Sequence, residues 1–287
     1  MNEQDFPALY RSADHLSVAS QRQFLDALMI HLITLVLAAF LSFVNIPHWS
    51  IAVLQLLALL GALACSIYLF ASRPDRFWYT GRAVAESIKT LTWRYVCRAE
   101  PFQTNDESSH LAFTQKLRSV VEQNREVCEA LTKHLAEEQF TARMEEIRSS
   151  PLEHRRMVYT DQRVKDQLAW YARKACFNRR RSKLFFRALV FINLAAVVCA
   201  ALRIAHPQQP YWPTDIFVAI AASLLSWMQA KKFSELASSY ALTAHEIGMI
   251  KDQSHFPMTD QEFSLFVGDA ENAFSREHTQ WVARKDA

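Results

Sequence analysis

The chain has very little glycine: its 287 residues contain only four, at positions 61, 81, 248 and 268. None of them forms a GxGxxG loop or a GxxxxGKS/T loop, so the usual backbone cradles for a nucleotide phosphate are missing. No GxSxG turn occurs either, which removes the nucleophile elbow of serine hydrolases. Signals for β-strands are equally scarce. The composition excludes most nucleotide-hydrolysing and dinucleotide-binding enzymes and predicts a chain that is nearly all helix.

The sequence also lacks metal-binding spacing. Its five cysteines are odd in number and far apart, and no CxxC pair occurs, so reduced apolar thiols are expected. His245-Glu246 is similar to the start of a helical zinc motif, but Met249 stands where the second histidine should be. We therefore expect no metal, no cofactor and no catalytic residues. The net charge of +3 is too small to indicate a nucleic-acid partner.

Four long apolar runs, in two pairs, dominate what the chain does contain. They cover residues 27–46, 51–72, 184–205 and 213–230. A helix rises about 1.5 Å per residue, so about 20 residues cross a hydrocarbon layer about 30 Å thick. The runs are apolar all round rather than along one stripe, as suits a helix surrounded by lipid. The pattern predicts an all-α integral membrane protein with four transmembrane helices in two hairpins.

The positions of lysine and arginine predict the orientation of these hairpins. The connection 47–50 has neither residue, and the connection 203–213 has only Arg203. Basic residues crowd the other ends of the runs: Arg73, Arg76, Arg179, Arg180, Arg181, Lys183, Lys231 and Lys232. Because such residues stay on the cytoplasmic side, both termini are expected in the cytoplasm. Arg179, Arg180, Arg181 and Lys183 are expected to contact lipid headgroups.

The polar remainder is expected to form long helical cytoplasmic extensions that pack as a bundle. We predict a first unit at 1–104 with a cytoplasmic helix at 76–98. A helical connector follows at 105–158, and a second unit at 159–287 ends in a helix at 259–285.

Several local signals place helix ends and breaks within these units. Pro74 is expected to kink or restart the helix after the second span, and Asn105 or Asp106 to cap the next helix. The fourth span is expected to continue as helix to about Lys251. Thr259 and Glu262 have capping-box spacing.

The two halves show a faint parallel repeat. Residues 83–88 and 242–247 are similar and fall at similar distances after their spans. Both hairpins begin on the same side, so the repeat keeps its orientation and is not inverted.

One predicted cytoplasmic helix, which reaches about Leu135, carries a coiled-coil pattern. Its apolar positions and one asparagine are spaced 4, 3, 4, 3 and 4 residues apart: Phe113, Leu117, Val120, Asn124, Val127 and Leu131. Such an asparagine fixes the register of a helix pair. The pattern leaves open whether this seam contacts another subunit or packs within the same chain.

Of the polar residues within the spans, which include Gln55, three are singled out as candidates. His31 and Arg187 lie about one turn from the cytoplasmic boundary, where a long side chain can reach the headgroups. Asn193 lies near the middle of its span, so its amide needs a partner on another helix or another subunit. The three residues are candidates either for a polar pore lining or for contacts between helices.

Two cytoplasmic helix faces combine charged and aromatic residues. The first holds Arg82, Glu86, Lys89 and Trp93, and the second holds Arg163, Gln167, Trp170, Tyr171 and Lys174. Aromatic rings beside arginine can stack on a nucleotide base and bind its phosphate. The same residues also suit a packed helix interface with satisfied ion pairs. Both interpretations remain open at this point.

Short motifs in both halves resemble the SLATT family. In the first half these are the stretch 81–89, Trp93-Arg94-Tyr95 and Pro101-Phe102. In the second half they are the stretch 159–163, Asp166-Gln167, Trp170-Tyr171 and Lys174-Ala175. The resemblance covers most of the chain and indicates a tandem form, with one unit in each half.

SLATT proteins are two-span membrane proteins of bacterial conflict systems, associated with nucleotide-making transferases and nucleotide-sensing partners. The resemblance implies a non-enzymatic antiphage effector in the bacterial inner membrane, gated by a nucleotide second messenger or a partner protein. On activation it would permeabilise the membrane as a pore. Since four spans with few polar groups line a path poorly, we expect a homo-oligomer in the lipid bilayer. The alternative is a membrane scaffold that recruits a cytoplasmic enzyme through the 113–135 helix or the last helix.

Overall fold

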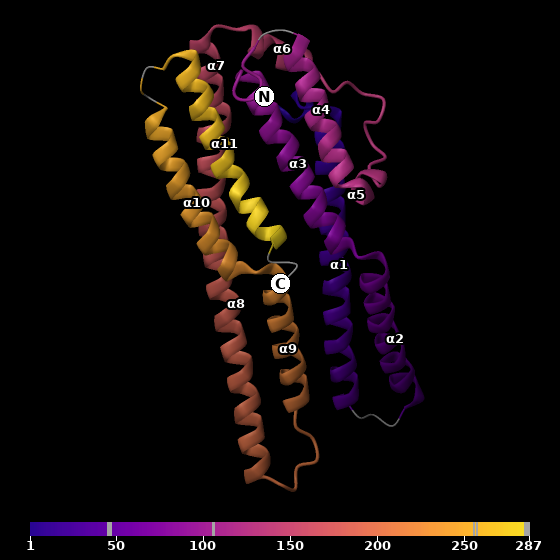
Figure 1. Cartoon of the computed structure of the whole chain (residues 1–287). Helices are drawn as coiled ribbons and strands as arrows, with labels where there is room; N and C mark the ends of the chain where they lie inside the picture. The colour runs from indigo at the N-terminus through magenta and orange to yellow at the C-terminus, as the bar shows by residue number, and fades with distance from the viewer. Residues whose placement is uncertain (45–47, 105–106, 255, 257, 284–287) are drawn as a thin grey trace. The chain divides into compact units, whose positions relative to one another are not determined.

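The computed structural model describes the chain except residues 45–47, 105–106, 255, 257 and 284–287, and it does not describe the side chains of 276–283. The described residues form helices and no strand, with 84% of the chain helical (Figure 1). The predicted all-α class is confirmed.

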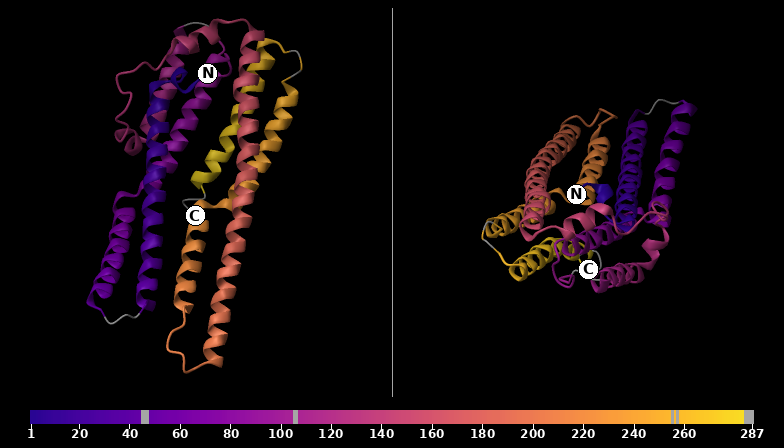
Figure 2. Two further views of the ribbon diagram at one scale, coloured as in Figure 1. Left: turned by 180° about the vertical axis from the view of Figure 1, so that it is seen from behind. Right: turned by 90° about the horizontal axis from the view of Figure 1, so that it is seen from above.

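Eleven α-helices are described in chain order. They are α1 (Ala8–Val44), α2 (Trp49–Ser72), α3 (Pro74–Val96), α4 (Glu107–Gln123), α5 (Arg125–Glu129), α6 (Ala142–Ser149), α7 (Leu152–Tyr159), α8 (Lys165–Ala205), α9 (Thr214–Lys231), α10 (Phe233–Gln253) and α11 (Asp260–Ala283). A short 3₁₀ turn covers Glu3–Asp5. A five-residue π-turn, Thr160–Val164, joins α7 to α8 without a break, so that the three form one rod (Figure 2).

Four of these helical rods are long and apolar enough to cross a membrane. Their most apolar windows have mean hydropathies of 2.5, 2.2, 2.3 and 1.2, yet only 11, 11, 6 and 11% of each window is buried within the chain. Exposing such a surface to water costs about 25 cal/mol per Å². Lipid is the solvent that removes this cost, so the chain is an integral membrane protein with four spans.

Two compact units share the helices. The bundle unit comprises Met1–Gln21, Asp75–Lys174 and Ser239–Ala287, and the span unit comprises Arg22–Pro74 and Ala175–Ser238. Contacts thus divide the chain between its polar and its apolar parts, and α1, α8 and α10 each contribute to both. The predicted sequence boundaries at 104 and 158 stay predictions.

The second helix of each hairpin ends at a residue in the left-handed conformation. Arg73 and Lys232 have positive φ angles of 41° and 48°, and each donates its backbone N–H to a carbonyl four residues earlier. The predicted restart at Pro74 is confirmed. The fourth rod, for which no break was expected before Lys251, breaks at Lys232. The sequence does not signal this break, because the left-handed residue is a lysine rather than the usual glycine and no proline follows it.

The faint repeat has a structural counterpart. Residue 83 lies nine positions after the start of α3, and residue 242 lies nine positions after the start of α10. Within the two stretches, Ile88 and Ile247 occupy equivalent positions and are both fully buried. The two halves therefore place the same apolar residue in the core of the bundle unit.

The coiled-coil pattern belongs to the chain's own core. Phe113, Leu117, Val127 and Leu131 are buried, and Asn124 donates its side-chain amide to the Val120 carbonyl. Packing within the chain is thus the alternative that the structure supports for this seam. The predicted continuous helix to Leu135 is wrong: α4 ends at Gln123 and α5 at Glu129.

The last helix starts as its capping box predicts. The Thr259 backbone N–H donates to Glu262 at 2.8 Å, and the Glu262 N–H donates to the Thr259 hydroxyl at 3.3 Å. Its apolar face is buried and consists of Phe263, Phe266, Val267, Ala270 and Phe274. The predicted caps at Asn105 and Asp106, the first span's last residues and the end of the last helix lie outside the described residues.

The left-handed residue Arg73 gives a test of the hairpin geometry. Arg73→Gly should raise the free energy of unfolding by about 0.5–1 kcal/mol relative to Arg73→Ala, because glycine alone adopts positive φ without a Cβ clash. Both variants lose the same charge, so chemical unfolding of the detergent-solubilised chain isolates the backbone term. Equal stability of the two variants would contradict the left-handed conformation.

Candidate functional site

A buried ion pair lies at the centre of the bundle unit. Arg163 donates from Nε to Glu271 Oε1 at 2.9 Å and from Nη2 to Oε2 at 2.7 Å. The side chains are 1% and 0% exposed. This two-point geometry is the strongest form of an arginine–carboxylate pair, and it joins the π-turn to α11.

Two hydroxyl groups complete the hydrogen bonding of Glu271. Tyr159 donates to Oε1 at 3.0 Å and Thr90 donates to Oε2 at 2.9 Å. Burial raises the pKa of Tyr159 well above its usual value, and the neighbouring carboxylate raises it further. The carboxylate thus has four donors, which compensates for its removal from water.

The guanidinium of Arg163 has one nitrogen left over. Nη1 is buried and has no hydrogen-bond partner among the described residues, but the guanidinium carbon lies 4.9 Å from the centre of the Phe274 ring. Burial alone would lower the pKa of Arg163; the charge and hydrogen bonds of Glu271 outweigh burial and raise it. The arginine therefore stays charged inside the bundle.

The π-turn explains how Tyr159 and Arg163 reach one carboxylate. The Lys165 N–H donates to the Thr160 carbonyl, five residues earlier, so this turn holds one residue more than an α-helical turn. Arg163 sits within the turn and Tyr159 directly precedes it. Turns of this kind are frequent at functional sites because they re-aim one side chain without ending the helix.

A second charged cluster lies between α1 and α3. Arg82 pairs with Glu86 at 2.6 Å and with Asp14 at 3.4 Å. Burial would lower the pKa of Arg82, but the two carboxylates together raise it. Burial raises the pKa of Asp14, and Arg82 opposes this shift.

Lys89 connects the two clusters. Burial lowers its pKa; Glu86 opposes that shift and the nearby Arg163 adds to it. Within the described part of the chain, Lys89 makes no hydrogen bond or ion pair of its own. We call the combined set the charge network, which holds three cations and three carboxylates: Arg82, Lys89, Arg163, Asp14, Glu86 and Glu271.

The structure thus brings together part of each face that the sequence singled out. Arg82, Glu86 and Lys89 meet Arg163 in the network. Trp93, from the first face, is 1% exposed and packs edge-on against Phe6 and Tyr159, so it belongs to the core.

The aromatic residues of the second face pack on each other. Trp170 meets Tyr171 and Tyr240 edge-on, with ring centres 4.9 and 5.4 Å apart, and the Lys174 ammonium lies 5.6 Å from the Trp170 ring centre. Gln167 is half-buried and has no hydrogen bond among the described residues. These contacts agree with the packed-interface interpretation of this face.

The candidate residues of the spans differ in their surroundings. His31 bridges α1 and α2, with Nδ1 at 3.0 Å from the Ala62 carbonyl and 3.4 Å from the Ser66 hydroxyl. Arg187 is exposed, and Asn193 is exposed with its amide donating to the Leu189 carbonyl of its own helix. Arg179, Arg180, Arg181 and Lys183 are also exposed, as headgroup contacts require.

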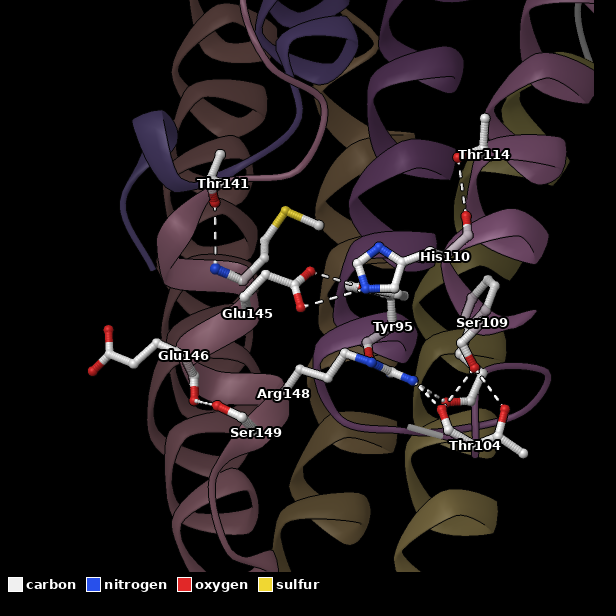
Figure 3. Close-up of polar contacts among 12 residues, drawn as sticks. Tyr95, Thr104, Ser109, His110, Thr114, Thr141, Glu145, Glu146, Arg148 and Ser149 are labelled. Atoms are coloured by element: carbon white, nitrogen blue, oxygen red, sulfur yellow. Dashed lines mark hydrogen bonds and ion pairs between the residues drawn. The ribbon is translucent and has the colours of Figure 1, made fainter. Parts of the chain in front are cut away.

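A third polar cluster lies around Tyr95 in the bundle unit (Figure 3). The Tyr95 hydroxyl donates to Glu145 at 2.8 Å and lies 3.0 Å from His110 Nε2, which therefore carries the proton between them. Arg148, 1% exposed, donates to the carbonyls of Tyr95, Phe102 and Thr104. The cluster fastens the turn after α3 to α4 and α6, which is a structural role.

Sequence reasoning missed Glu271, Tyr159 and Asp14. Glu271 carried a signal: it lies on the apolar face of α11, four residues after Val267 and three before Phe274. A carboxylate in an apolar stripe must find a buried cation. Tyr159 stood in the family motif 159–163 without an assigned role, and Asp14 carried no comparable signal because its partner comes from a distant segment.

Together, the fold and the charge network define a helical membrane protein whose two span hairpins are joined to one polar bundle. Residues 7–156 match the family model described as SMODS and SLOG-associating 2TM effector domain 3. Residues 159–281 match the model described as SMODS and SLOG-associating 2TM effector domain 1. The chain belongs to the SLATT family and carries two of its domains in tandem. No curated protein and no solved structure matches the chain.

The buried pair should dominate the stability of the bundle unit. Glu271→Leu should lower the free energy of unfolding by about 3–5 kcal/mol, because it leaves the Arg163 charge buried without a counter-ion. Tyr159→Phe, the matched control, removes one donor and keeps the pair, so it should cost about 1 kcal/mol. Chemical unfolding in detergent measures both. Equal losses in the two variants would show that the pair has no special weight.

Proposed function

We propose that the chain is a non-enzymatic effector of a bacterial conflict system that permeabilises the inner membrane when it is activated. The family assignment supports the effector role, since the matched models describe two-span effector domains. The four apolar rods support the membrane as its place of action. In this proposal the bundle unit faces the cytoplasm and holds the spans inactive until a signal arrives.

The observation that carries the proposal is the continuity of one helical rod. From Leu152 to Ala205 the chain is helical without interruption, and the rod includes the π-turn with Arg163 as well as the third span. A rotation of the rod near Arg163 therefore turns the span with it. A helix transmits such a change because its backbone hydrogen bonds keep it stiff.

The π-turn supplies two discrete states for this rod. When the π-turn converts to an ordinary α-helical turn, the chain keeps all its residues but each turn closes over one residue fewer. Everything after the turn then rotates by about 100° and shifts by about 1.5 Å, the values for one helical residue. The Arg163–Glu271 pair stabilises the π state because both partners are buried and satisfied there. Loss of that pair is the proposed activating event.

Lys89 is the place where a ligand would act on the pair. Its ammonium lies near both Arg163 and Glu86 and has no hydrogen bond among the described residues. A phosphate-bearing nucleotide or an acidic segment of a partner protein would bind Lys89 and compete with the carboxylates of the network. The signal would thereby weaken the ion pair between Glu271 and Arg163.

Loss of the Arg163–Glu271 pair tests this coupling. Glu271→Gln removes the charge that pairs with Arg163 and should favour the α-helical register, so the purified chain should release dye from liposomes without any activator. Gln162→Ala, the control, changes an exposed side chain of the same turn and keeps the pair, so it should leak no more than the unchanged chain.

Two outcomes would refute the proposal at different levels. A Glu271→Gln variant that folds but leaks no more than Gln162→Ala would refute the role of the π-turn and its ion pair. Liposomes that stay tight with every variant and partner, together with an unchanged membrane potential on expression, would refute permeabilisation itself.

The orientation has its own test. In a chain whose native cysteines are replaced, Gln209→Cys should react with a membrane-impermeant maleimide in intact spheroplasts, because the α8–α9 connection faces outward in the proposal. Asp269→Cys on α11 should react only after lysis. Both positions are exposed, so protection reports the membrane and not burial in the chain. The reverse labelling would place the bundle unit outside.

The scaffold alternative receives no support from the two elements assigned to it. Most apolar residues of the 113–131 seam and the described apolar residues of α11 are buried within the bundle unit and so are occupied by the chain's own core.

A further inference from the structure

Asn193 is a polar side chain that its own chain leaves half-satisfied. It lies within the span part of α8, and it is exposed in the span unit. Its amide nitrogen donates to the Leu189 carbonyl at 2.9 Å, and among the described residues no group donates to its amide oxygen. In hydrocarbon, where no water can donate, such an oxygen is costly.

The residues around Asn193 form a regular exposed seam. They are spaced 4, 3, 4, 3 and 4 residues apart: Phe186, Val190, Asn193, Val197, Ala200 and Ile204. All six are exposed, with Val197 at 63% and Ile204 at 83%. The seam residues differ from the half-buried positions of α8, such as Phe185, which stacks on Phe233 of α10. This is the spacing by which two helices interlock along their length.

The chain itself contains a matched case for comparison. The 113–131 stretch has the same spacing in its sequence, and although its helix breaks at Asn124, its residues Phe113, Leu117, Val127 and Leu131 are buried in the core of the bundle unit. The seam on α8 has no such filling among the described residues. Apolar contacts alone would not draw a partner to it, because lipid is as apolar as the seam. The asparagine is what favours a protein neighbour over lipid.

The chemistry of the seam points to a second copy of this chain. Copies in one membrane share their orientation, so two α8 helices meet in parallel, and residues of the same number face each other. A primary amide both donates and accepts, so two Asn193 side chains satisfy each other at the centre of the contact. We propose that the Asn193 seam pairs with the same seam of a second copy. The proposal rests on the membrane location and does not require permeabilisation.

Self-association of the full chain in lipid tests the pairing. Asn193→Leu should raise the dissociation constant about tenfold, as loss of an interhelical amide contact does, when energy transfer between labelled copies is measured. Asn193→Gln retains the amide and should keep most of the affinity. Because leucine suits both helix and hydrocarbon, the Leu variant should still insert and fold. An unchanged dissociation constant in Asn193→Leu would overturn the proposal.

Disulfide formation between copies tests the register. With the native cysteines replaced, Val197→Cys should form linked dimers, and Val198→Cys should not, although it is exposed and adjacent in sequence. Equal dimer yields at the two positions would overturn the seam. Copies that pair through Asn193 and yet leave liposomes tight would refute permeabilisation alone.

Discussion

The solvation of four apolar rods is the constraint on which the rest of the structure depends. The chain buries only 6–11% of the residues in their most apolar windows, so lipid must cover most of this surface. Lipid offers no hydrogen bonds, which obliges each span to satisfy its own backbone as a helix. In the bundle unit α1 and α8 continue directly from spans, whereas α3 and α10 start anew after the left-handed residues Arg73 and Lys232.

The charge network joins the two family domains. Asp14, Arg82, Glu86 and Lys89 come from the segment 7–156, whereas Arg163 and Glu271 come from the segment 159–281. Each half balances its own charges: Arg82 pairs with Asp14 and Glu86 in the first, and Arg163 pairs with Glu271 in the second. The halves are linked inside the bundle unit by the hydrogen bond from Thr90 to Glu271 and by the edge-on packing of Trp93 against Tyr159.

The tandem halves retain some features and have lost others. Both restart their helices at a basic residue with a positive φ angle, and both bury an isoleucine at the same distance beyond it. They differ at the position of Glu86, whose counterpart on α10 is His245. The acidic partner of Arg163 comes instead from α11, which follows that counterpart in the chain. The two halves thus share a backbone plan and divide the chemistry between them.

Local patterns in the sequence were sufficient for the spans, the helical class, the capping box at Thr259 and the family resemblance. Each of these depends on residues close together in the chain, where composition and spacing act directly. Only the tertiary structure decided three other features: the left-handed break at Lys232, the break between α4 and α5 within the 113–131 seam, and the partners of Arg163. Burial determines whether an arginine is a surface charge or half of an internal pair, and burial of Arg163 depends on a carboxylate 108 residues away. The sequence by itself determined which parts of the chain lie in lipid and which in water, while the choice of charge partners awaited the packing of distant helices.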